Sequence, residues 1–149
     1  MSVRHMPGHL IRRLHQISTQ TFARGMQAAG FDLTPVQFAS LDAIRDNPGI
    51  DQAGVAQLIA YDRATIGGVI DRLVQKGYVS RTVSTRDRRA RVLHLTEHGR
   101  AVLAAALPVV SALQADILPG LDARERARLL ELMRKAIDRA EACATAAER

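Results

Sequence analysis

The 149-residue sequence predicts one mostly α-helical domain that carries a single small β-hairpin. Near both chain ends, apolar residues recur at three- and four-residue steps, as they do in amphipathic helices. Two short helical segments occupy the middle of the chain. Directly after them, residues 78–83 and 91–95 alternate between apolar and polar side chains, which is typical of strands. An apolar content of 47% is ample for a hydrophobic core.

The first predicted helix covers residues 7–29. Along one line at helical spacing lie Leu10, Leu14, Ile17 and Thr21. His9 and Arg13 border one edge of this apolar stripe, and His15 borders the other. Titratable groups at the margin of an apolar face are well placed to line a cleft against a neighbouring helix.

The second predicted helix begins with a capping box. Thr34 and Gln37 have the required spacing, and Pro35 occupies the first helical position, where its missing amide hydrogen does no harm. The helix is expected to end before Asn47, and Ile50 to add a brief strand beside the hairpin.

Two shorter helices follow. Asp51 is expected to cap a helix over residues 52–60, because its carboxylate accepts from free amides of the first turn. Asp62 is expected to cap a second helix that runs from Arg63 to Lys76. Gly77 ends that helix, since glycine adopts the left-handed conformation at little cost.

The predicted hairpin has a basic tip. Its strands are joined by residues 84–90, which include three arginines and one aspartate. Two short helices followed by a basic hairpin are the parts of a winged helix-turn-helix. In that fold the second helix enters the major groove of DNA, while the hairpin, or wing, reaches the backbone or the minor groove.

Two helices are predicted after the wing. Thr96 is expected to cap a long helix that Pro108 should kink, and Asp122 with Glu125 to cap a final helix. Their apolar stripes comprise Val102, Ala106, Val109, Leu113 and Ile117, then Leu129, Leu132, Met133, Ala136 and Ile137. Together with the first helix they exceed what a small domain needs to cover its own core. The excess apolar surface predicts a two-fold symmetric homodimer.

Charge is concentrated on the proposed DNA-binding parts. The net charge is +6, and residues 61–91 alone hold eight bases against three acids. Residues 1–31 hold four arginines and no acidic residue. A basic recognition helix and wing suit a phosphate backbone. Aromatic residues make up only 3%, which disfavours readers of single strands or RNA that stack on exposed bases.

Other functional classes find little support. No apolar run reaches the eighteen or so residues of a membrane helix, and no signal-peptide pattern is present, so we expect a cytoplasmic protein. The single cysteine, Cys143, fits a reducing compartment and has no second cysteine nearby for a redox switch. Neither catalytic constellations nor metal-ligand spacings stand out, so no enzyme activity, cofactor or metal is expected.

The order of residues in the middle of the chain resembles the MarR family of bacterial transcription regulators. The positions that carry the resemblance are Leu58, Asp62, Arg63, Thr65, Asp71, Arg72, Leu73, Gly77, Tyr78, Val79, Arg81, Asp87, Arg89, Leu93, Leu95, Thr96 and Gly99. The resemblance extends over nearly the whole chain. It implies a single MarR-type domain over residues 1–149, with a DNA-binding lobe at about 34–96 and dimerisation helices at 7–29 and 97–147.

The start of the proposed recognition helix supplies the first candidate DNA contacts. Arg63 could donate to a phosphate or a guanine, and Thr65, beside Ala64, could bond a phosphate or touch a thymine methyl. Gly67 and Gly68 each cost roughly 1 kcal/mol relative to alanine inside a helix. Close approach of the helix backbone to DNA would justify that cost; tight packing against another helix is the alternative.

The wing supplies the remaining candidates. Arg89 resembles the family arginine that enters the minor groove, and Asp87 the carboxylate that orients it. Arg86 and Arg88 are interpreted as phosphate contacts. The alternative is a solvated basic hairpin without a partner.

The resemblance also implies a small-molecule pocket between the dimerisation helices and the DNA-binding lobe. Residues 7–17 and 61–68 look most like the branch that controls catabolism of aromatic acids such as nicotinate or hydroxybenzoate. A carboxylate ligand needs donors in a largely apolar cleft. The candidate ligand-binding residues are His9, Arg13, His15, Phe38 and Arg72. Ion pairs across the dimer would explain the charged ones equally well.

The sequence therefore predicts a homodimeric repressor that binds a pseudo-palindromic operator in double-stranded DNA and is released by a small aromatic acid. Two alternatives stay open. One is a winged-helix regulator that responds to an oxidant or a phenolic antibiotic. The other is a protein-interaction module that has kept the fold without binding DNA.

Overall fold

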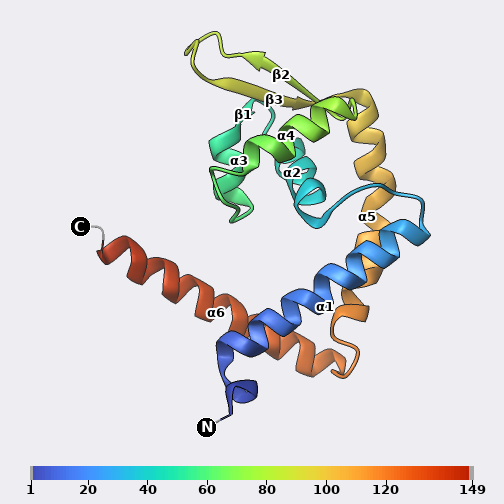
Figure 1. The fold of residues 1–149 in the computed structure, drawn as a ribbon, viewed down its shortest axis with the longest axis vertical. Helices are drawn as coiled ribbons and strands as arrows, with labels where there is room; N and C mark the ends of the chain where they lie inside the picture. Colours follow the sequence, from blue (N-terminus) through green and yellow to red (C-terminus); the bar gives the residue numbers. More distant parts are fainter. Residues whose placement is uncertain (1, 148–149) are drawn as a thin grey trace. The chain divides into compact units, whose positions relative to one another are not determined.

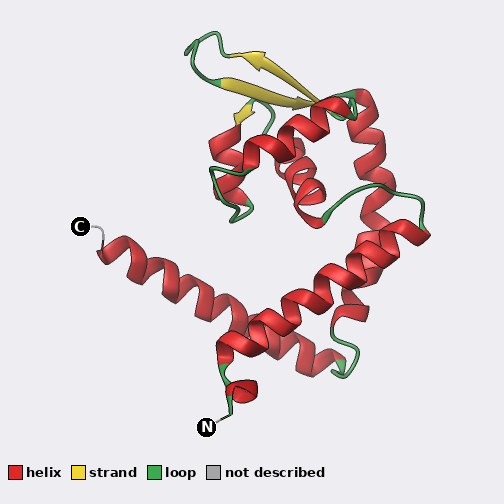
Figure 2. Ribbon diagram, in the orientation of Figure 1, coloured by secondary structure: helices red, strands yellow, loops and turns green. Residues whose placement is uncertain are grey.

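The computed structural model describes residues 2–147, which form helices and one small antiparallel sheet (Figure 1, Figure 2). The elements in order are a 3-10 turn at Val3–His5, α1 (Pro7–Ala28), α2 (Pro35–Asp46), β1 (Ile50–Asp51), α3 (Gln52–Leu58), α4 (Ile66–Gln75), β2 (Val79–Val83), β3 (Arg91–Leu95), α5 (Glu97–Ile117) and α6 (Ala123–Ala147). The chain divides into two compact units, the first ending at Leu113 and the second beginning at Gln114, so the boundary falls inside α5. The predicted fold class, mostly helical with a β-wing, is confirmed.

The three strands lie in the order β1-β3-β2, and both pairings are antiparallel. β2 and β3 form the wing, with Arg81 opposite Leu93. The predicted strand at Ile50 is confirmed, since Ile50 lies opposite Leu93 on the other side of β3. β3 is thus the central strand. It belongs to the wing and, through its pairing with β1, joins the wing to the rest of the first unit.

The core of the first unit lies between α2, α3, α4, the sheet and the first half of α5. Its most deeply buried members, each at most 1% exposed, are Met26, Leu41, Ile44, Val55, Ile70, Leu73, Leu93, Leu103 and Ala106. Ile66, Ile70 and Leu73 lie on one face of α4, as the predicted periodicity requires. Truncating such a leucine to alanine typically costs about 2–5 kcal/mol, so this face fixes α4 against α2 and α3.

The predicted capping box of α2 is present. The hydroxyl of Thr34 accepts from the amide of Gln37 at 3.2 Å, and the side-chain oxygen of Gln37 accepts from the amide of Thr34 at 3.2 Å. At α3, the carboxylate of Asp51 accepts from the amide of Gly54 at 2.7 Å, as predicted. Local hydrogen bonding therefore sets where both helices begin.

The start of α4 differs from the sequence prediction. The helix begins at Ile66 rather than Arg63, and residues 63–65 form a turn. The carboxylate of Asp62 accepts from the amide of Ala64, only two residues on, at 3.3 Å. The carbonyl of Asp62 accepts from the amides of both Thr65 and Ile66 at 3.1 Å, so residues 63–65 form a turn before the regular helix begins. At the other end Gly77 has φ +75° and terminates the helix as predicted.

Thr96 joins the end of α4 to the start of α5. Its hydroxyl accepts from the amide of Gly99 at 2.9 Å, the predicted cap, and donates to the carbonyl of Gly77 at 2.6 Å. Its amide donates to the carbonyl of Tyr78 at 3.0 Å. A Cβ on Gly99 would lie 2.0 Å from that carbonyl oxygen, so only glycine fits at this position.

α1 packs on the first unit through its C-terminal half. Phe22 and Met26 are buried, and the ring of Phe22 meets that of Phe38 edge-on at a centroid distance of 6.1 Å. A Cβ on Gly25 would lie 2.3 Å from a methyl carbon of Leu113, so the missing side chain makes room for α5.

α5 continues through Pro108 as one helix, and the predicted kink stays a prediction. Its mean hydropathy of 1.4 makes it, among the described residues, the one helix long and apolar enough to cross a membrane, contrary to the sequence expectation. Within α5, Gly99, Leu103 and Ala106 are buried, and 11% of the apolar window is buried. The composition reflects a helix with small and apolar residues on more than one face.

α6 belongs to the second unit. The carboxylate of Asp122 accepts from the amide of Glu125, and that of Glu125 from the amide of Asp122, both at 2.9 Å, so this predicted cap is also confirmed. No described residue of α6 is buried. Large apolar side chains stay exposed along it, namely Leu130, Leu132, Met133 and Ile137. The stripe therefore remains a candidate dimer surface.

Candidate DNA-binding surface and effector site

The predicted base-reading residues lie together at the N-terminal end of α4. Arg63, Ala64 and Thr65 are all exposed in the turn that leads into the helix. The hydroxyl of Thr65 donates to the carbonyl of Asp62 at 3.2 Å, which fixes its side chain in the turn. The exposed guanidinium of Arg63 is free of any ion pair that the structure records within residues 2–147.

Of the two glycines of α4, Gly68 is exposed and Gly67 is half-buried beside Gln52 of α3. A Cβ on Gly68 would meet nothing within 4 Å in the described chain. A Cβ on Gly67 would meet only the side-chain nitrogen of Gln52, at an ordinary 3.6 Å. Packing within this chain therefore gives no reason for glycine at either position. The bare backbone faces outward, where another molecule could approach it closely.

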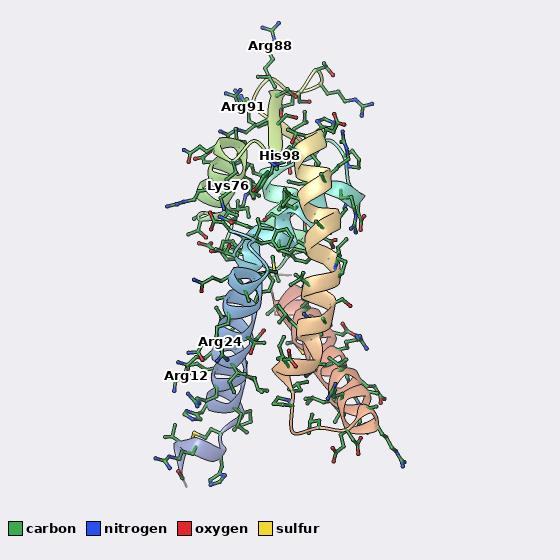
Figure 3. All side chains as sticks on the ribbon, turned by 90° about the vertical axis from the view of Figure 1, so that its right-hand side faces the viewer. Arg12, Arg24, Lys76, Arg88, Arg91 and His98 are labelled. Carbon is green, nitrogen blue, oxygen red and sulfur yellow. The ribbon has the colours of Figure 1, made fainter. Side chains whose placement is uncertain are left out.

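The wing tip is an ordered turn with its arginines outside. The hydroxyl of Ser84 accepts from the amides of Arg86 and Asp87 at 3.2 and 3.3 Å. The side chains of Arg86, Arg88 and Arg89 are exposed, and Arg88 projects from the end of the wing (Figure 3). The tip thus presents three cations to solvent on a backbone fixed by its own hydrogen bonds.

The carboxylate and the carbonyl of Asp87 bond the main chain of the wing tip. Its carboxylate accepts from the backbone amide of Arg89 at 2.9 Å, and its carbonyl from the amide of Ala90 at 3.0 Å. No ion pair with the guanidinium of Arg89 is recorded in the described part of the chain. Asp87 therefore holds the main chain at Arg89 in its turn conformation. Its side chain is short, so its carboxylate lies within reach of the amide two residues further along the chain.

Sequence reasoning missed a link between the wing and the helices. The guanidinium of Arg81 on β2 donates to Asp71 of α4 at 2.7 Å and to Gln52 of α3 at 2.9 Å. One side chain therefore joins the wing to both helices of the helix-turn-helix. The sequence did show an arginine, Arg81, on a predicted strand and an acid, Asp71, on the helix before it. Their spacing alone, however, does not predict that the two side chains meet.

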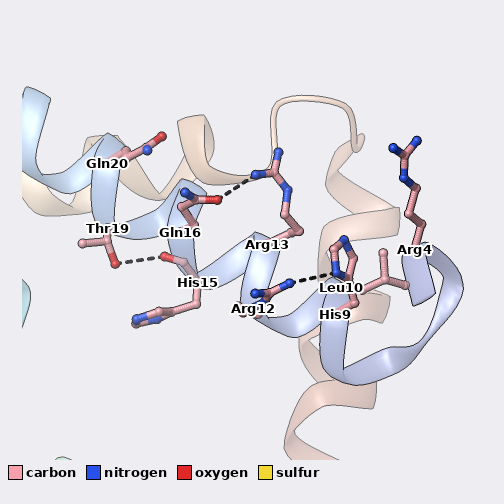
Figure 4. A pocket seen from close by; sticks show the side chains of 9 residues that line it. All are labelled: Arg4, His9, Leu10, Arg12, Arg13, His15, Gln16, Thr19 and Gln20. Carbon is pink, nitrogen blue, oxygen red and sulfur yellow. Dashed lines mark hydrogen bonds between the residues drawn. The ribbon is translucent and has the colours of Figure 1, made fainter.

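Part of the predicted effector site forms one hollow on α1. His9, Arg13 and His15 line it with Arg4, Arg12 and neighbouring polar residues (Figure 4). A guanidinium nitrogen of Arg12 lies 3.0 Å from Nδ1 of His9, and Arg13 donates to Gln16 at 2.7 Å. Arg12 and Arg13 thus bond to neutral groups, and no ion pair of either is recorded within residues 2–147.

The other two predicted effector residues are not part of this hollow. Phe38 packs edge-on against Phe22 beside the core, so it serves the junction of α1 and α2. Arg72 is exposed in the last turn of α4. Neither lines the hollow on α1. The sequence could not foresee this, because the faces of single helices do not say how the helices are placed.

The one ion pair with resolved pKa shifts in the described chain lies away from these surfaces. At the end of α2, a hydrogen bond from Arg45 lowers the pKa of Asp46, and the same bond raises the pKa of Arg45. Within residues 2–147 no group of three or more His, Cys, Asp or Glu side chains could hold a metal ion. The exposed arginines suit the candidate surfaces to binding anions.

Comparison with known proteins agrees with this arrangement. The MarR family profile matches residues 31–90. The HTH-type transcriptional repressor NicR of Pseudomonas putida is 37% identical over 131 residues, which cover 88% of this chain and 82% of NicR.

Solved structures extend the similarity to the fold. BpsR of Bordetella bronchiseptica, whose DNA binding is regulated by 6-hydroxynicotinic acid, superposes with a TM-score of 0.85 at 30% identity, covering 93% of this chain and 97% of BpsR. The transcriptional repressor CouR, bound to a 23-mer DNA duplex, gives a TM-score of 0.78 at 31% identity, covering 91% of this chain and 94% of CouR. With a winged helix-turn-helix and relatives that match over most of their length, the chain belongs to the MarR family of transcriptional regulators.

Proposed function

We propose that this regulator is a homodimeric repressor that binds a pseudo-palindromic operator and is released by a small aromatic acid of the hydroxynicotinate or hydroxybenzoate class. The observation that carries the DNA-binding half is the outward-facing backbone at Gly67 and Gly68, beside an exposed Arg63. A helix whose first turn is bare lies deeper in a major groove than one with side chains there. The binding of CouR to a duplex supports this use of the same fold.

Support for an anionic effector comes from the hollow on α1. Arg4, Arg12 and Arg13 surround it, with two histidines that can donate to a carboxylate. Arginine without a carboxylate partner is a ready site for an aromatic acid, because the planar guanidinium binds a carboxylate through two parallel hydrogen bonds. The regulation of BpsR by 6-hydroxynicotinic acid and the similarity to NicR support this ligand class.

The mechanism we infer is a shift between two arrangements of the dimer. The recognition helices of the two subunits must lie about one helical turn of DNA apart to read both half-sites. An effector that binds a different spacing better draws the population toward it. A coupling free energy of roughly 1–3 kcal/mol would weaken operator binding about 5- to 150-fold.

Dimerisation is supported by the apolar stripe of α6, where Leu132, Met133 and Ile137 are 44%, 44% and 53% exposed. A contiguous stripe of this kind is stabilised when a second copy covers it. Light scattering of the purified protein tests this part directly. A mass of one chain at micromolar concentration would contradict the proposal.

The effector is tested on an operator obtained by selection from a random duplex library. Fluorescence anisotropy then measures operator affinity with and without millimolar 6-hydroxynicotinate or 4-hydroxybenzoate. The matched control is 4-hydroxybenzamide, which keeps the ring and removes the negative charge. We expect both acids to weaken binding and the amide to be inactive. Unchanged affinity with every acid would refute the effector class while leaving DNA binding intact.

A protein-interaction module with the same fold is separated from a DNA-binding regulator by salt. Each neutralised phosphate contributes about −0.9 to the slope of log affinity against log salt. A DNA-binding regulator therefore shows a steep negative slope on any duplex. A slope near zero, or no binding at low salt, would favour the interaction module.

A further inference from the structure

Lys76, labelled in Figure 3, is the residue that follows α4, and it bonds to residues that come much earlier in the sequence. Its ammonium donates to the carbonyl oxygen of Asp32 and to the side-chain oxygen of Gln37, the latter at 3.2 Å. The carboxylate of Asp32 lies 3.2 Å from the same nitrogen. These partners are 44 and 39 residues away in sequence, so the contact is tertiary and joins the end of α4 to the connection between α1 and α2.

The three acceptors differ in how strongly they bind the ammonium of Lys76. The side chain of Asp32 is 95% exposed, so water and salt screen its ion pair, and such pairs contribute little. Gln37 is 6% exposed, and the side chain of Lys76 only 22%. A hydrogen bond from an ammonium to a sheltered neutral acceptor is stronger than a screened ion pair. The neutral acceptors therefore carry the contact.

Gln37 connects Lys76 to the first turn of α2. The same side-chain oxygen that accepts from Lys76 also accepts from the amide of Thr34, closing the capping box. Moving Lys76 would thus disturb the acceptor that completes the cap. Helix ends favour a cation at their C-terminus, yet the ammonium of Lys76 bonds to other segments instead.

We propose that Lys76 is a positioning residue for DNA binding, which sets the position of α4 by bonding to Gln37 and the main chain of Asp32. The proposal rests on the assignment of α4 as the recognition helix. Loss of these bonds leaves the end of α4 held by Thr96, through the carbonyl of Gly77, and by apolar contacts, which are not directional, so that end can shift relative to the connection between α1 and α2. Misplacement of a recognition helix by about an ångström lengthens its hydrogen bonds to DNA beyond their usual range.

A direct contact between Lys76 and a phosphate is the competing explanation. The two differ in salt dependence. Losing a phosphate contact reduces the slope of log affinity against log salt by about 0.9, whereas losing a positioning bond lowers affinity at all salt concentrations and leaves the slope unchanged.

The test compares Lys76→Met with Asp32→Asn in the full-length protein, by anisotropy on a selected operator from low to moderate salt. Methionine keeps the apolar stem and removes the ammonium. We expect Lys76→Met to lower affinity about tenfold, which corresponds to about 1.4 kcal/mol, with an unchanged salt slope. Asp32→Asn keeps the main-chain carbonyl and should bind within a factor of about two of wild type, an interaction of only a few tenths of a kcal/mol.

A second pair of variants guards against simple unfolding. Gln37→Glu keeps both the acceptor and the cap, so it should bind like wild type. Gln37→Leu should weaken binding, and the loss in the double variant with Lys76→Met should be smaller than the sum of the two single losses, because both remove the bond between Lys76 and Gln37. A flatter slope for Lys76→Met, fully additive losses, or an Asp32→Asn defect as large as that of Lys76→Met would each overturn the proposal. If wild type itself bound no duplex, the proposed function would fail instead.

Discussion

The guanidinium of Arg81 on β2 and the carboxylate of Asp71 on α4 form an ion pair at 2.7 Å, and Arg81 also bonds Gln52 of α3. The side chains are 30% and 53% exposed, so the pair is partly screened. We expect Arg81→Met and Asp71→Asn each to lower the free energy of unfolding by about 1 kcal/mol or less. A double-mutant cycle in urea should give a coupling of about 0.2–1 kcal/mol. A coupling of zero would mean that the pair adds no stability.

Gly68→Ala should change stability and DNA affinity in opposite directions. A Cβ there meets nothing within the described chain, so alanine should stabilise the helix by roughly 0.5–1 kcal/mol. If the backbone of α4 lies close to DNA, the added methyl group blocks that approach and weakens operator binding. Thermal melting and anisotropy on the same preparation measure both effects. Tighter or equal DNA binding would show that the bare backbone is not a contact.

Arg89→Ala should weaken DNA binding and flatten its salt dependence. The side chain is exposed at the wing tip, and its backbone is held by Asp87. Removing one cation that neutralises a phosphate or enters the minor groove should reduce the salt slope by up to about 0.9. The matched control is Arg139→Ala on α6, an exposed arginine outside the wing. Equal effects of both substitutions would indicate a loss of general charge rather than of a wing contact.

Arg13→Ala should blunt the response to an aromatic acid and leave effector-free DNA binding largely intact. Arg13 bonds only Gln16 among the contacts recorded for its side chain, so its removal breaks no ion pair in the described chain. Operator titrations with and without 6-hydroxynicotinate separate the two properties. If the variant responds like wild type, Arg13 does not bind the effector.

Ala60→Gly should stabilise the protein. Ala60 adopts φ +53°, the left-handed conformation, at the end of α3, where Tyr61 donates back to Ala56 at 2.9 Å. This conformation costs an alanine roughly 1–2 kcal/mol, and glycine adopts it freely. After allowing for the larger entropy of unfolded glycine, we expect a gain of about 0.5–1 kcal/mol in urea unfolding. Destabilisation would show that the strain has been misjudged.

Local features of this chain could be predicted, and distant contacts could not. The capping residues Thr34, Asp51 and Thr96 act over three positions, so their spacing alone reveals them. The start of α4 was predicted three residues too early, because the carbonyl of Asp62 accepts from the amides of both Thr65 and Ile66 and the first turn is not regular α-helix.

The partners of Arg81 and Lys76 could not be predicted, because the contacts span 10 to 44 residues and depend on how helices are placed. For the same reason the predicted effector residues do not all lie together. His9, Arg13 and His15 share one helix and one hollow, whereas Phe38 and Arg72 belong to other elements.

The bonds around Thr96 have a mechanical consequence. Thr96 fastens the carbonyl of Gly77 to the first turn of α5, and Gly99 fits against the backbone of Tyr78 without a side chain between them. The trailing end of α4 is therefore pinned by directional bonds, while its leading end rests on the apolar side chain of Ile66. A helix that is fixed at its C-terminal end moves most at its N-terminal end. Any tilt of α5 would therefore move the turn that carries Arg63 sideways.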